Sequence, residues 1–175
     1  MARLPARSII QRGTDHFQQR IRDIEEHAVC IRGFAPAAVF GVFQTEAYAS
    51  AEKARGLHRH RVRLLHDPPH AYERYECEWG YVFTGGAGED IRVLDPADHR
   101  LPAELVDHDY WLLDDVRAVR MHYAEGGAFL GATVEPDLIE AYRAGRDAAW
   151  RLAEPFNTWW NRHPEHHRDN DGKAA

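Results

Sequence analysis

Cysteine, lysine and long apolar runs are all scarce in this chain of 175 residues, and each scarcity excludes a class of protein. Cys30 and Cys77 form no CxxC pair and cannot build a disulfide framework, so we expect a reducing, cytoplasmic environment. The longest apolar runs, such as residues 35–39, are too short for a membrane-spanning helix. The N-terminus has no apolar core behind its arginines and does not resemble a secretory signal.

A surplus of positive charge is also missing. The 22 Lys and Arg residues are outnumbered by 28 Asp and Glu residues, which gives a net charge of −6. Nucleic-acid-binding proteins usually carry a basic surplus along one face or one helix, so we expect no direct contact with nucleic acid. Only Lys53 and Lys173 are lysines, which leaves few candidates for a mechanism that needs a catalytic amine.

The spacing of apolar residues divides the chain into three parts. Residues 1–56 are predicted to form a helical extension, with Thr14 as a candidate N-cap and apolar residues from Phe17 to Ile31 at intervals of three or four. Residues 57–160 predict an α/β domain, and the polar, proline-containing residues 161–175 predict a disordered tail. Within the α/β domain we expect strands over 61–65, 91–94, 110–113, 118–123 and 129–134, and helices over 71–83 and 138–160.

Two details of the predicted helices can be tested directly. Helix 71–83 should have an apolar side made of Tyr72, Tyr75, Trp79 and Val82. Pro155 should kink or end the final helix, because proline cannot donate a helical hydrogen bond.

Histidine is abundant, with 12 residues, so metal sites need to be considered. His163, His166 and His167 gather in the predicted tail, where they could bind metal adventitiously. No pair of histidines recurs with a Cys or carboxylate partner at a familiar spacing, so we expect no metal site and no cofactor. The glycine-rich residues 85–89 follow a helix and precede a strand, which predicts a helix end and a turn instead of a phosphate loop.

Charged residues also fall at the ends or on the polar faces of the predicted core elements, where burial requires pairing. On predicted strand 118–123, Arg120 and His122 project from the same face. Two interpretations stay open: a structural ion-pair network, which we favour, and a pocket for a small anionic ligand, since arginine suits carboxylates and phosphates. The candidate ligand-binding residues are Arg74, Glu89, Arg92, Asp115, Arg120, His122 and Tyr123. None is assigned a catalytic role.

Six segments, taken in order, carry a resemblance to a known family: residues 61–65 (RVRLL), 72–76 (YERYE), 87–94 (AGEDIRVL), 110–115 (YWLLDD), 119–123 (VRMHY) and 142–149 (YRAGRDAA). Over about 43–160 the chain resembles an actinobacterial family, the domain of unknown function 6879. Members are commonly encoded beside helix-turn-helix regulators, so the resemblance implies a partner in regulation and brings no reaction with it.

A second resemblance lies nearer the N-terminus, in residues 25–36 (EEHAVCIRGFAP) and 40–49 (FGVFQTEAYA). These residues resemble the opening of the effector domain that follows the DNA-binding helix-turn-helix in actinobacterial regulators of the Xre type. There the motif reads Pro-Gly-Leu-Leu-Gln-Thr, whereas Phe40 and Phe43 replace the proline and a leucine here. The two resemblances together suggest a piece of a regulator fused to its companion, without a DNA-reading helix.

The predicted order of elements also resembles half of the phospholipase D fold, whose catalytic motif is His-x-Lys-x4-Asp. His108 and Asp115 keep that spacing, but Tyr110 occupies the lysine position and the chain offers one copy where active enzymes pair two. Tyrosine cannot supply the cation that offsets phosphoryl charge. The expected fold class is therefore α/β, a phospholipase D-like half domain with a mixed sheet flanked by helices and a helical N-terminal extension.

These observations favour a cytoplasmic, non-catalytic regulatory or sensor protein that acts with a helix-turn-helix transcription regulator encoded nearby. Besides that regulator, we expect a small anionic ligand as a partner, and neither nucleic acid nor a membrane. Two alternatives stay open. One is a hydrolase or transferase that uses the arginine and acid cluster around Asp115, and the other is a truncated remnant without independent activity.

Overall fold

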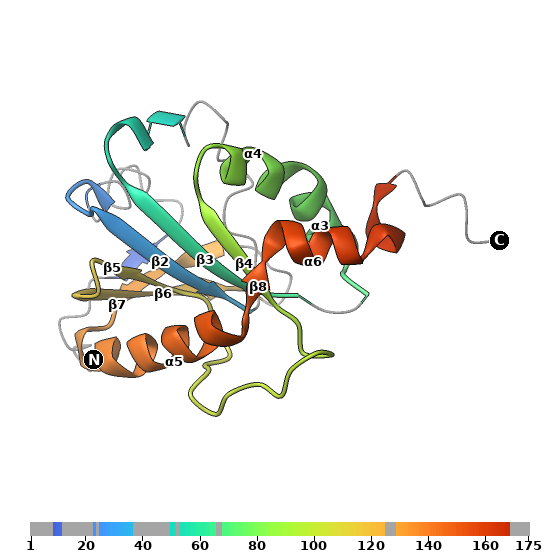
Figure 1. The fold of residues 1–175 in the computed structure, drawn as a ribbon. Helices are drawn as coiled ribbons and strands as arrows, with labels where there is room; N and C mark the ends of the chain where they lie inside the picture. Colours follow the sequence, from blue (N-terminus) through green and yellow to red (C-terminus); the bar gives the residue numbers. More distant parts are fainter. Residues whose placement is uncertain are drawn as a thin grey trace.

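The computed structural model describes residues 9–11, 23, 25–36, 50–51, 53–65, 68–124 and 129–168. In these residues eight strands form one mixed sheet in the order β1-β7-β6-β5-β2-β3-β4-β8 (Figure 1). The strands are β1 (Ile9–Gln11), β2 (Cys30–Ala35), β3 (His58–Leu64), β4 (Asp90–Leu94), β5 (Tyr110–Leu113), β6 (Arg117–Tyr123), β7 (Phe129–Val134) and β8 (Glu154–Pro155).

The sheet joins a parallel half to an antiparallel half. Strands β2, β3 and β4 run parallel, and the short β8 closes that edge antiparallel to β4. On the other side of β2, β5, β6 and β7 follow one another as an antiparallel meander, and β1 pairs antiparallel with β7. The α/β class with a mixed sheet is confirmed, and each of the five predicted strands overlaps a strand of the structure.

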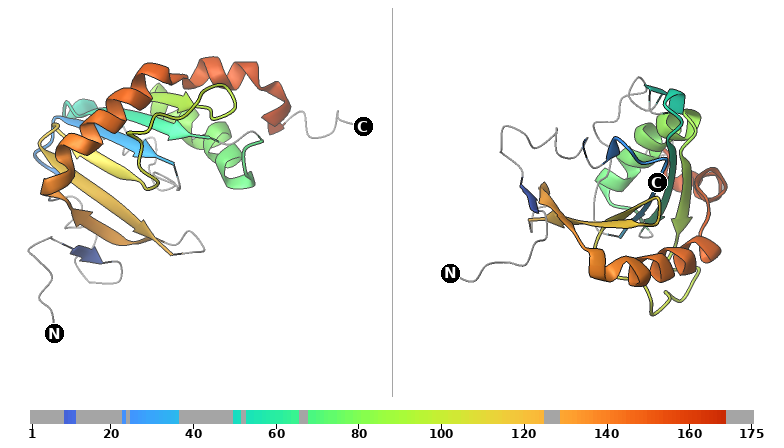
Figure 2. Two further views of the ribbon diagram at one scale, coloured as in Figure 1. Left: turned by 90° about the horizontal axis from the view of Figure 1, so that it is seen from below. Right: turned by 90° about the vertical axis from the view of Figure 1, so that its left-hand side faces the viewer.

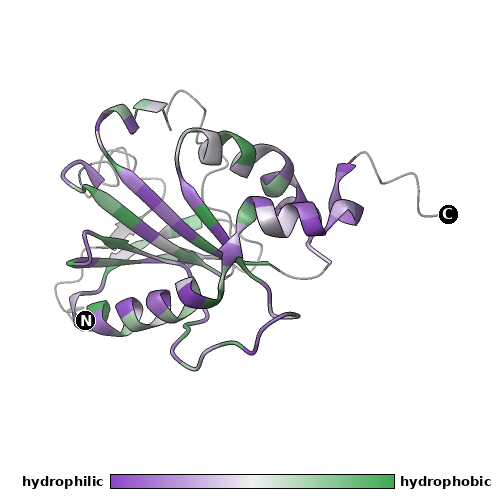
Figure 3. Cartoon of the chain, viewed as in Figure 1, coloured by the Kyte–Doolittle hydropathy of each residue, from purple (hydrophilic) through white to green (hydrophobic). Residues whose placement is uncertain are grey.

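Helices cover both faces of the sheet (Figure 2). Helix α5 (Ile139–Leu152) packs Tyr142 and Ala149 against Phe34, Val62 and Leu112 from three neighbouring strands. Polar and apolar residues alternate in bands along α5, because a helix that covers a sheet needs one apolar stripe (Figure 3). On the opposite face lie α3 (Ala71–Tyr75), a π-helical turn (Glu76–Gly80) and α4 (Tyr81–Gly86).

The predicted final helix is interrupted at the expected proline. Helix α5 ends at Leu152, β8 contains Pro155, and α6 (Phe156–Arg162) begins directly after it. Phe156 and Trp159 of α6 then pack with Tyr81 in the core on the α3–α4 side of the sheet. The chain therefore crosses from one face of the sheet to the other at Pro155.

The apolar side predicted for residues 71–83 is wrong. Tyr75, Trp79 and Val82 are 53%, 45% and 54% exposed. The buried side of this segment carries Glu73, Glu76, Cys77 and Tyr81. The helix is turned away from its apolar residues because the sheet beneath it presents two buried arginines, Arg61 and Arg63, and these need carboxylate partners.

The helical extension predicted for residues 1–56 holds only in part. Residues 23 and 25 and residues 50, 51, 53 and 54 are helical, whereas residues 12–22, 24, 37–49 and 52 lie outside the described residues. Cys30–Ala35 is a strand, so a helix continuing to Ile31 is wrong. Strand β2 lies between β3 and β5 in the middle of the sheet, so the segment 1–56 contributes a central strand to the α/β domain.

The disordered tail predicted from residue 161 is wrong for its described part. Helix α6 continues to Arg162, a 3₁₀ turn spans Pro164–His166, and His166 is buried. Residues 169–175 lie outside the described residues. Within the described part of the chain, no helix combines the length and apolarity needed to cross a membrane.

Candidate functional site

His108, the histidine that matches the phospholipase D motif, and the polar residues predicted on β6 lie together where β5 begins and β6 ends. Strands β5 and β6 are antiparallel with Tyr110 opposite Arg120, so β5 begins where β6 ends. His108 therefore lies near the end of β6, and its charge affects the pKa of His122. The charge of Glu135, which follows β7, also reaches His122. We call the following set the His108 site: His108, Arg120, His122, Glu135 and Tyr142.

Three side chains of the His108 site form a chain of hydrogen bonds. His108 Nε2 lies 2.8 Å from Tyr142 Oη, which donates over 3.4 Å to Oε2 of the buried Glu135. The other ring nitrogen, Nδ1, lies 3.0 Å from Asp107 Oδ1, and this hydrogen bond holds the pKa of Asp107 below its ordinary value. Both nitrogens of His108 are thus engaged within the protein.

Arg120 and His122 project beside this chain from the same face of β6, as predicted. His122 Nε2 lies 2.8 Å from Thr133 Oγ1 on the neighbouring β7. Burial lowers the pKa of His122, and the positive charge of Arg120 lowers it further. Arg120 Nε is buried and has no hydrogen-bond partner among the described residues. Arg120 is therefore the group in the His108 site that could hold an anion.

The lysine position of the motif is filled by a side chain that belongs to the core. Tyr110 is 1% exposed, and its ring stacks on that of Tyr142 with centroids 4.2 Å apart. Its hydroxyl donates to the Tyr142 carbonyl oxygen at 2.9 Å. Burial raises the pKa of Tyr110 well above its ordinary value, so the group is neutral at physiological pH.

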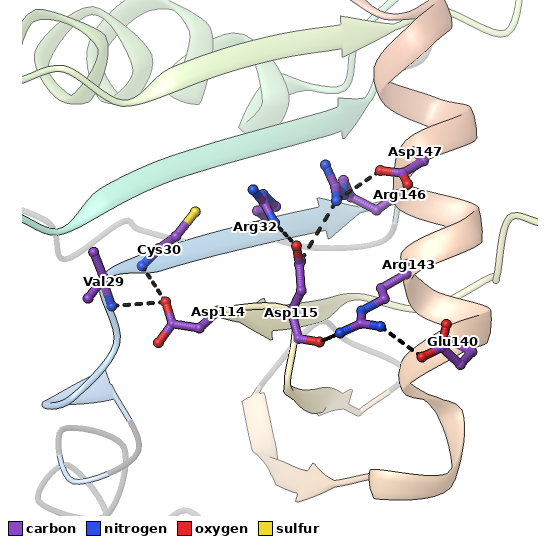
Figure 4. Close-up of polar contacts among 9 residues, drawn as sticks. All are labelled: Val29, Cys30, Arg32, Asp114, Asp115, Glu140, Arg143, Arg146 and Asp147. Carbon is purple, nitrogen blue, oxygen red and sulfur yellow. Dashed lines mark hydrogen bonds and ion pairs between the residues drawn. The ribbon is translucent and has the colours of Figure 1, made fainter.

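Asp115, the last residue of the motif, lies at the far end of β5 in the turn to β6 (Figure 4). Asp114 and Asp115 both adopt left-handed backbone conformations, with φ of 51° and 57°. Asp115 forms ion pairs with Arg32 of β2 and, at 3.7 Å, with Arg146 of α5. The carboxylate proposed for a hydrolase or transferase is thus held between two arginines, and it ties the turn to β2 and α5.

Its neighbour Asp114 caps the start of β2. Its Oδ1 accepts the backbone N–H groups of Val29 at 3.0 Å and Cys30 at 2.7 Å (Figure 4). The Asp115 carbonyl oxygen accepts from Arg143 of α5, which also pairs with Glu140 at 2.8 Å. These contacts tie the turn between β5 and β6 to β2 and to α5.

A second group of charges lies on the opposite face of the sheet, beneath α3 and α4. We call it the Arg63 cluster, and it consists of Arg61, Arg63, Glu73, Glu76 and Glu89. Arg63, 2% exposed, donates to Ala35 O at 2.7 Å and to Glu76 Oε2 at 3.3 Å, and it lies 3.8 Å from Glu73 Oε1. Arg61 Nε lies 2.8 Å from Glu89 Oε1. These contacts make the cluster a buried ion-pair network.

Sequence reasoning missed four of the five residues in the Arg63 cluster. The available signal was the period of two along β3, where Arg59, Arg61 and Arg63 share one face and His60 and Val62 share the other. A central strand with a fully basic face requires acidic partners from the elements packed on it.

The remaining predicted residues are dispersed. Arg74 Nε donates to the His166 carbonyl oxygen at 3.1 Å, and Arg92 lies over the ring of Trp150 at 4.1 Å. Burial and the charge of Asp109 raise the pKa of Tyr123, on the face opposite to His122. Of the seven predicted residues, the structure brings Arg120 and His122 together with His108. Asp115 lies beyond the other end of β5, and Arg74, Glu89 and Arg92 contact other parts of the fold.

Several solved structures share this fold, among them Nuc and TrmBL2. Nuc from Salmonella typhimurium, a phospholipase D family member, matches with a TM-score of 0.60 and 13% identity over 87% of this chain and 98% of that chain. TrmBL2, an archaeal chromatin protein with a novel mode of DNA binding, matches with a TM-score of 0.51 and 11% identity over 85% of this chain and 54% of that chain. At such identities the likeness concerns the fold alone.

No curated protein matches the chain in sequence. The family model of the domain of unknown function DUF6879 matches residues 42–161, which span β3 to α6 and include the His108 site and the Arg63 cluster. The resemblance in the sequence and the fold of the structure therefore agree, and the chain belongs to the DUF6879 family, here with a fold like that of the phospholipase D family member Nuc.

Proposed function

We propose that this protein is a non-catalytic regulatory module that acts with a separately encoded helix-turn-helix transcription regulator. The observation that carries the first half of this proposal is the burial of Tyr110 at the lysine position of the motif. A neutral phenol in the core cannot offset the charge of a phosphoryl group.

The state of His108 supports the same conclusion. A nucleophilic histidine needs a ring nitrogen directed at the substrate, whereas His108 Nε2 is hydrogen-bonded to Tyr142 and Nδ1 to Asp107. The partner of Nε2 is itself held in place, because the Tyr142 ring is packed on Tyr110 and is 1% exposed. The His108 site is therefore better suited to holding its own elements together than to attacking a phosphodiester.

The partner follows from charge and from the fold relatives. The net charge of −6 disfavours binding of the DNA backbone, because neutralising phosphates dominates that affinity. TrmBL2 shares this fold and binds DNA, but this chain corresponds to only 54% of it. The family resemblance favours a helix-turn-helix regulator as the chain that reads DNA.

Arg120 gives the module a means of sensing. Arg120 is half-buried on the same face of β6 as His122, and it forms no ion pair among the described residues. Guanidinium groups recognise carboxylates and phosphates with paired hydrogen bonds. A small carboxylate- or phosphate-bearing ligand at Arg120 would alter the charge beside β6 and could thereby change the affinity for the regulator.

The proposal is tested with the full chain and the helix-turn-helix protein encoded next to its gene. Co-expression should yield a stable complex by size-exclusion chromatography, and the chain alone should not shift DNA at physiological salt. In a mobility-shift assay the chain should change the affinity of the regulator for its operator. Tight DNA binding by the isolated chain, or two proteins that elute separately and do not affect each other, would count against the proposal.

The catalytic alternative has its own assay. The purified chain should not hydrolyse bis-p-nitrophenyl phosphate. Turnover that disappears in the His108→Ala variant but persists in His58→Ala, a matched substitution of an exposed histidine, would assign the chain to the hydrolases instead.

A further inference from the structure

The segment that follows α6 brings three metal-ligating side chains together. His163, Glu165 and His166 each offer one ligand atom, and these atoms all lie within 4.8 Å of one another. Glu165 Oε1 lies 3.0 Å from His163 Nδ1 and 3.7 Å from His166 Nε2. A tetrahedral zinc ion with bonds of about 2.0–2.1 Å separates its ligand atoms by about 3.3 Å, so the observed distances bracket the required one.

The backbone of this segment is fixed without any ion. His163 N donates to Trp160 O at 3.2 Å, and His166 N donates to His163 O at 3.1 Å, which closes the 3₁₀ turn Pro164–His166. The His166 carbonyl oxygen accepts from Arg74 of α3. The turn is therefore anchored both to the end of α6 and to the body of the domain.

The two imidazoles are held by packing as well. The His163 ring lies 4.6 Å from Trp159, a fully buried side chain whose Nε1 donates to Asp95 Oδ2 at 2.9 Å. His166 is 7% exposed, whereas Glu165 is exposed and can turn toward an ion without disturbing the core. Preorganised ligands of this kind lower the cost of binding, because little side-chain freedom is lost.

We propose that His163, Glu165 and His166 form a binding site for a divalent transition metal, with zinc(II) as the best-suited ion. Two imidazoles and one carboxylate are donors that suit zinc. Three protein ligands leave a fourth position for water or for a donor from a bound partner. From the sequence we expect at most adventitious metal binding by these histidines, because no histidine pair recurs with a Cys or carboxylate partner at a familiar spacing.

The ion would connect the C-terminal turn to the rest of the domain. His163 follows α6 directly, and the turn that carries Glu165 and His166 is bound to α3 through Arg74. Bound zinc would therefore stabilise the turn through which the end of α6 contacts α3. This inference does not depend on the proposed function, since it concerns different residues and a different measurement.

The test uses the full chain without a histidine tag, stripped of metal with a chelator and then dialysed. Zinc is added in competition with a chromophoric chelator of known affinity. The wild-type chain should bind one zinc ion with a dissociation constant of about 1 µM or tighter. Glu165→Gln should weaken binding at least about tenfold, a loss of one ligand, and it should fold normally because Glu165 is exposed. His166→Asn should have the same effect.

Two control variants separate a built site from scattered surface histidines. His99 is exposed on another loop, and His167 Nε2 is hydrogen-bonded to Trp160 O, so His99→Ala and His167→Ala should retain wild-type affinity. In addition, zinc should raise the melting temperature of the wild type and leave that of Glu165→Gln unchanged. Weak zinc binding at several sites, or an equal loss of zinc affinity in Glu165→Gln and in the control variants, would overturn the proposal.

Discussion

The ring of Tyr110 lies almost flat on the ring of Tyr142, with centroids 4.2 Å apart and planes inclined by 10°. The Tyr110 hydroxyl also donates to the Tyr142 backbone carbonyl. Tyr110 of β5 therefore contacts α5 twice, by ring stacking and by a hydrogen bond. A position that carries a catalytic lysine in the phospholipase D motif serves here to dock a helix on the sheet.

Replacing this tyrosine by lysine should therefore destabilise the fold without creating activity. Tyr110→Lys places an ammonium group in the core, where the tyrosine hydroxyl now meets a backbone carbonyl oxygen. We expect the free energy of unfolding to fall by about 3 kcal/mol or more. Tyr110→Phe keeps the stacking and loses one hydrogen bond, which costs about 1 kcal/mol. Urea denaturation measures both values. Hydrolysis of bis-p-nitrophenyl phosphate by Tyr110→Lys would contradict the structural role.

Two alanine substitutions should separate the Arg63 cluster from the His108 site. Glu89→Ala removes the carboxylate 2.8 Å from Arg61 Nε, where both side chains are less than one tenth exposed, and should cost about 3–5 kcal/mol. Arg120→Ala breaks no ion pair among the described residues and should cost about 1 kcal/mol or less. Thermal and urea unfolding would show the difference. Equal losses in the two variants would mean that Arg120 is also part of a structural network.

The pKa of His122 makes stability depend on pH in a defined direction. Burial and Arg120 hold this pKa in the folded protein below the ordinary value of 6.5. Between the two values the unfolded chain binds more protons, so the free energy of unfolding should decrease as pH falls below about 6.5. His122→Asn should remove part of this decrease, and the part due to His60, whose pKa is lowered by burial, should remain.

The contribution of the Arg120 charge to the lowered pKa of His122 can be tested directly. In the Arg120→Gln variant the pKa of His122, measured by NMR titration of its ring protons, should rise toward the ordinary value. The pKa of His60 should not change, because the charges that affect it are those of Asp90, Arg32, Arg146 and His58. An unchanged pKa of His122 would contradict the placement of Arg120 in the His108 site.

The reversed orientation of the segment 71–86 predicts opposite effects for two aromatic residues on it. Tyr81 is 3% exposed and meets Phe156 edge to face, so Tyr81→Ala should cost about 3–5 kcal/mol. Trp79 is 45% exposed, so Trp79→Ala should change the free energy of unfolding by about 0.5 kcal/mol or less. Chemical denaturation of the two variants tests this directly. A larger loss of unfolding free energy in Trp79→Ala than in Tyr81→Ala would instead support the apolar side that the sequence predicts.

That orientation shows where sequence patterns stop being informative. Strands such as Tyr110–Leu113 and Phe129–Val134 could be predicted because their pattern reflects burial of apolar side chains alone. Glu73 and Glu76 are buried because of Arg63, and a pattern within one segment cannot reveal a partner on another. β2 was missed because Ala28 and Ile31 are three residues apart, as on a helix, and because Ile31 and Phe34 are buried on opposite faces of β2, which leaves no alternation to detect.

The candidate site could also be predicted only in part. Arg120 and His122 alternate on a strand, so their shared face followed from the period of two, and His108 was identifiable from its motif. The array of His108, Tyr142 and Glu135 was not predictable, because it joins a loop, a helix and the end of β7. The ordered turn after α6 was missed because aromatic stacking and an arginine from α3 hold it, and its own residues are polar.

The position of β2 has a consequence for the order in which the chain can fold during synthesis. Its parallel neighbour β3 follows soon after it, whereas its antiparallel neighbour β5 is made only after β4 and a long loop have been completed. Until Tyr110 pairs with Phe34, one side of β2 presents open backbone donors and acceptors to the crowded surroundings of the ribosome. The family match begins at residue 42, after β2. A fragment cut at that boundary would leave β3 and β5 facing an empty space one strand wide, and it should aggregate where the whole chain folds.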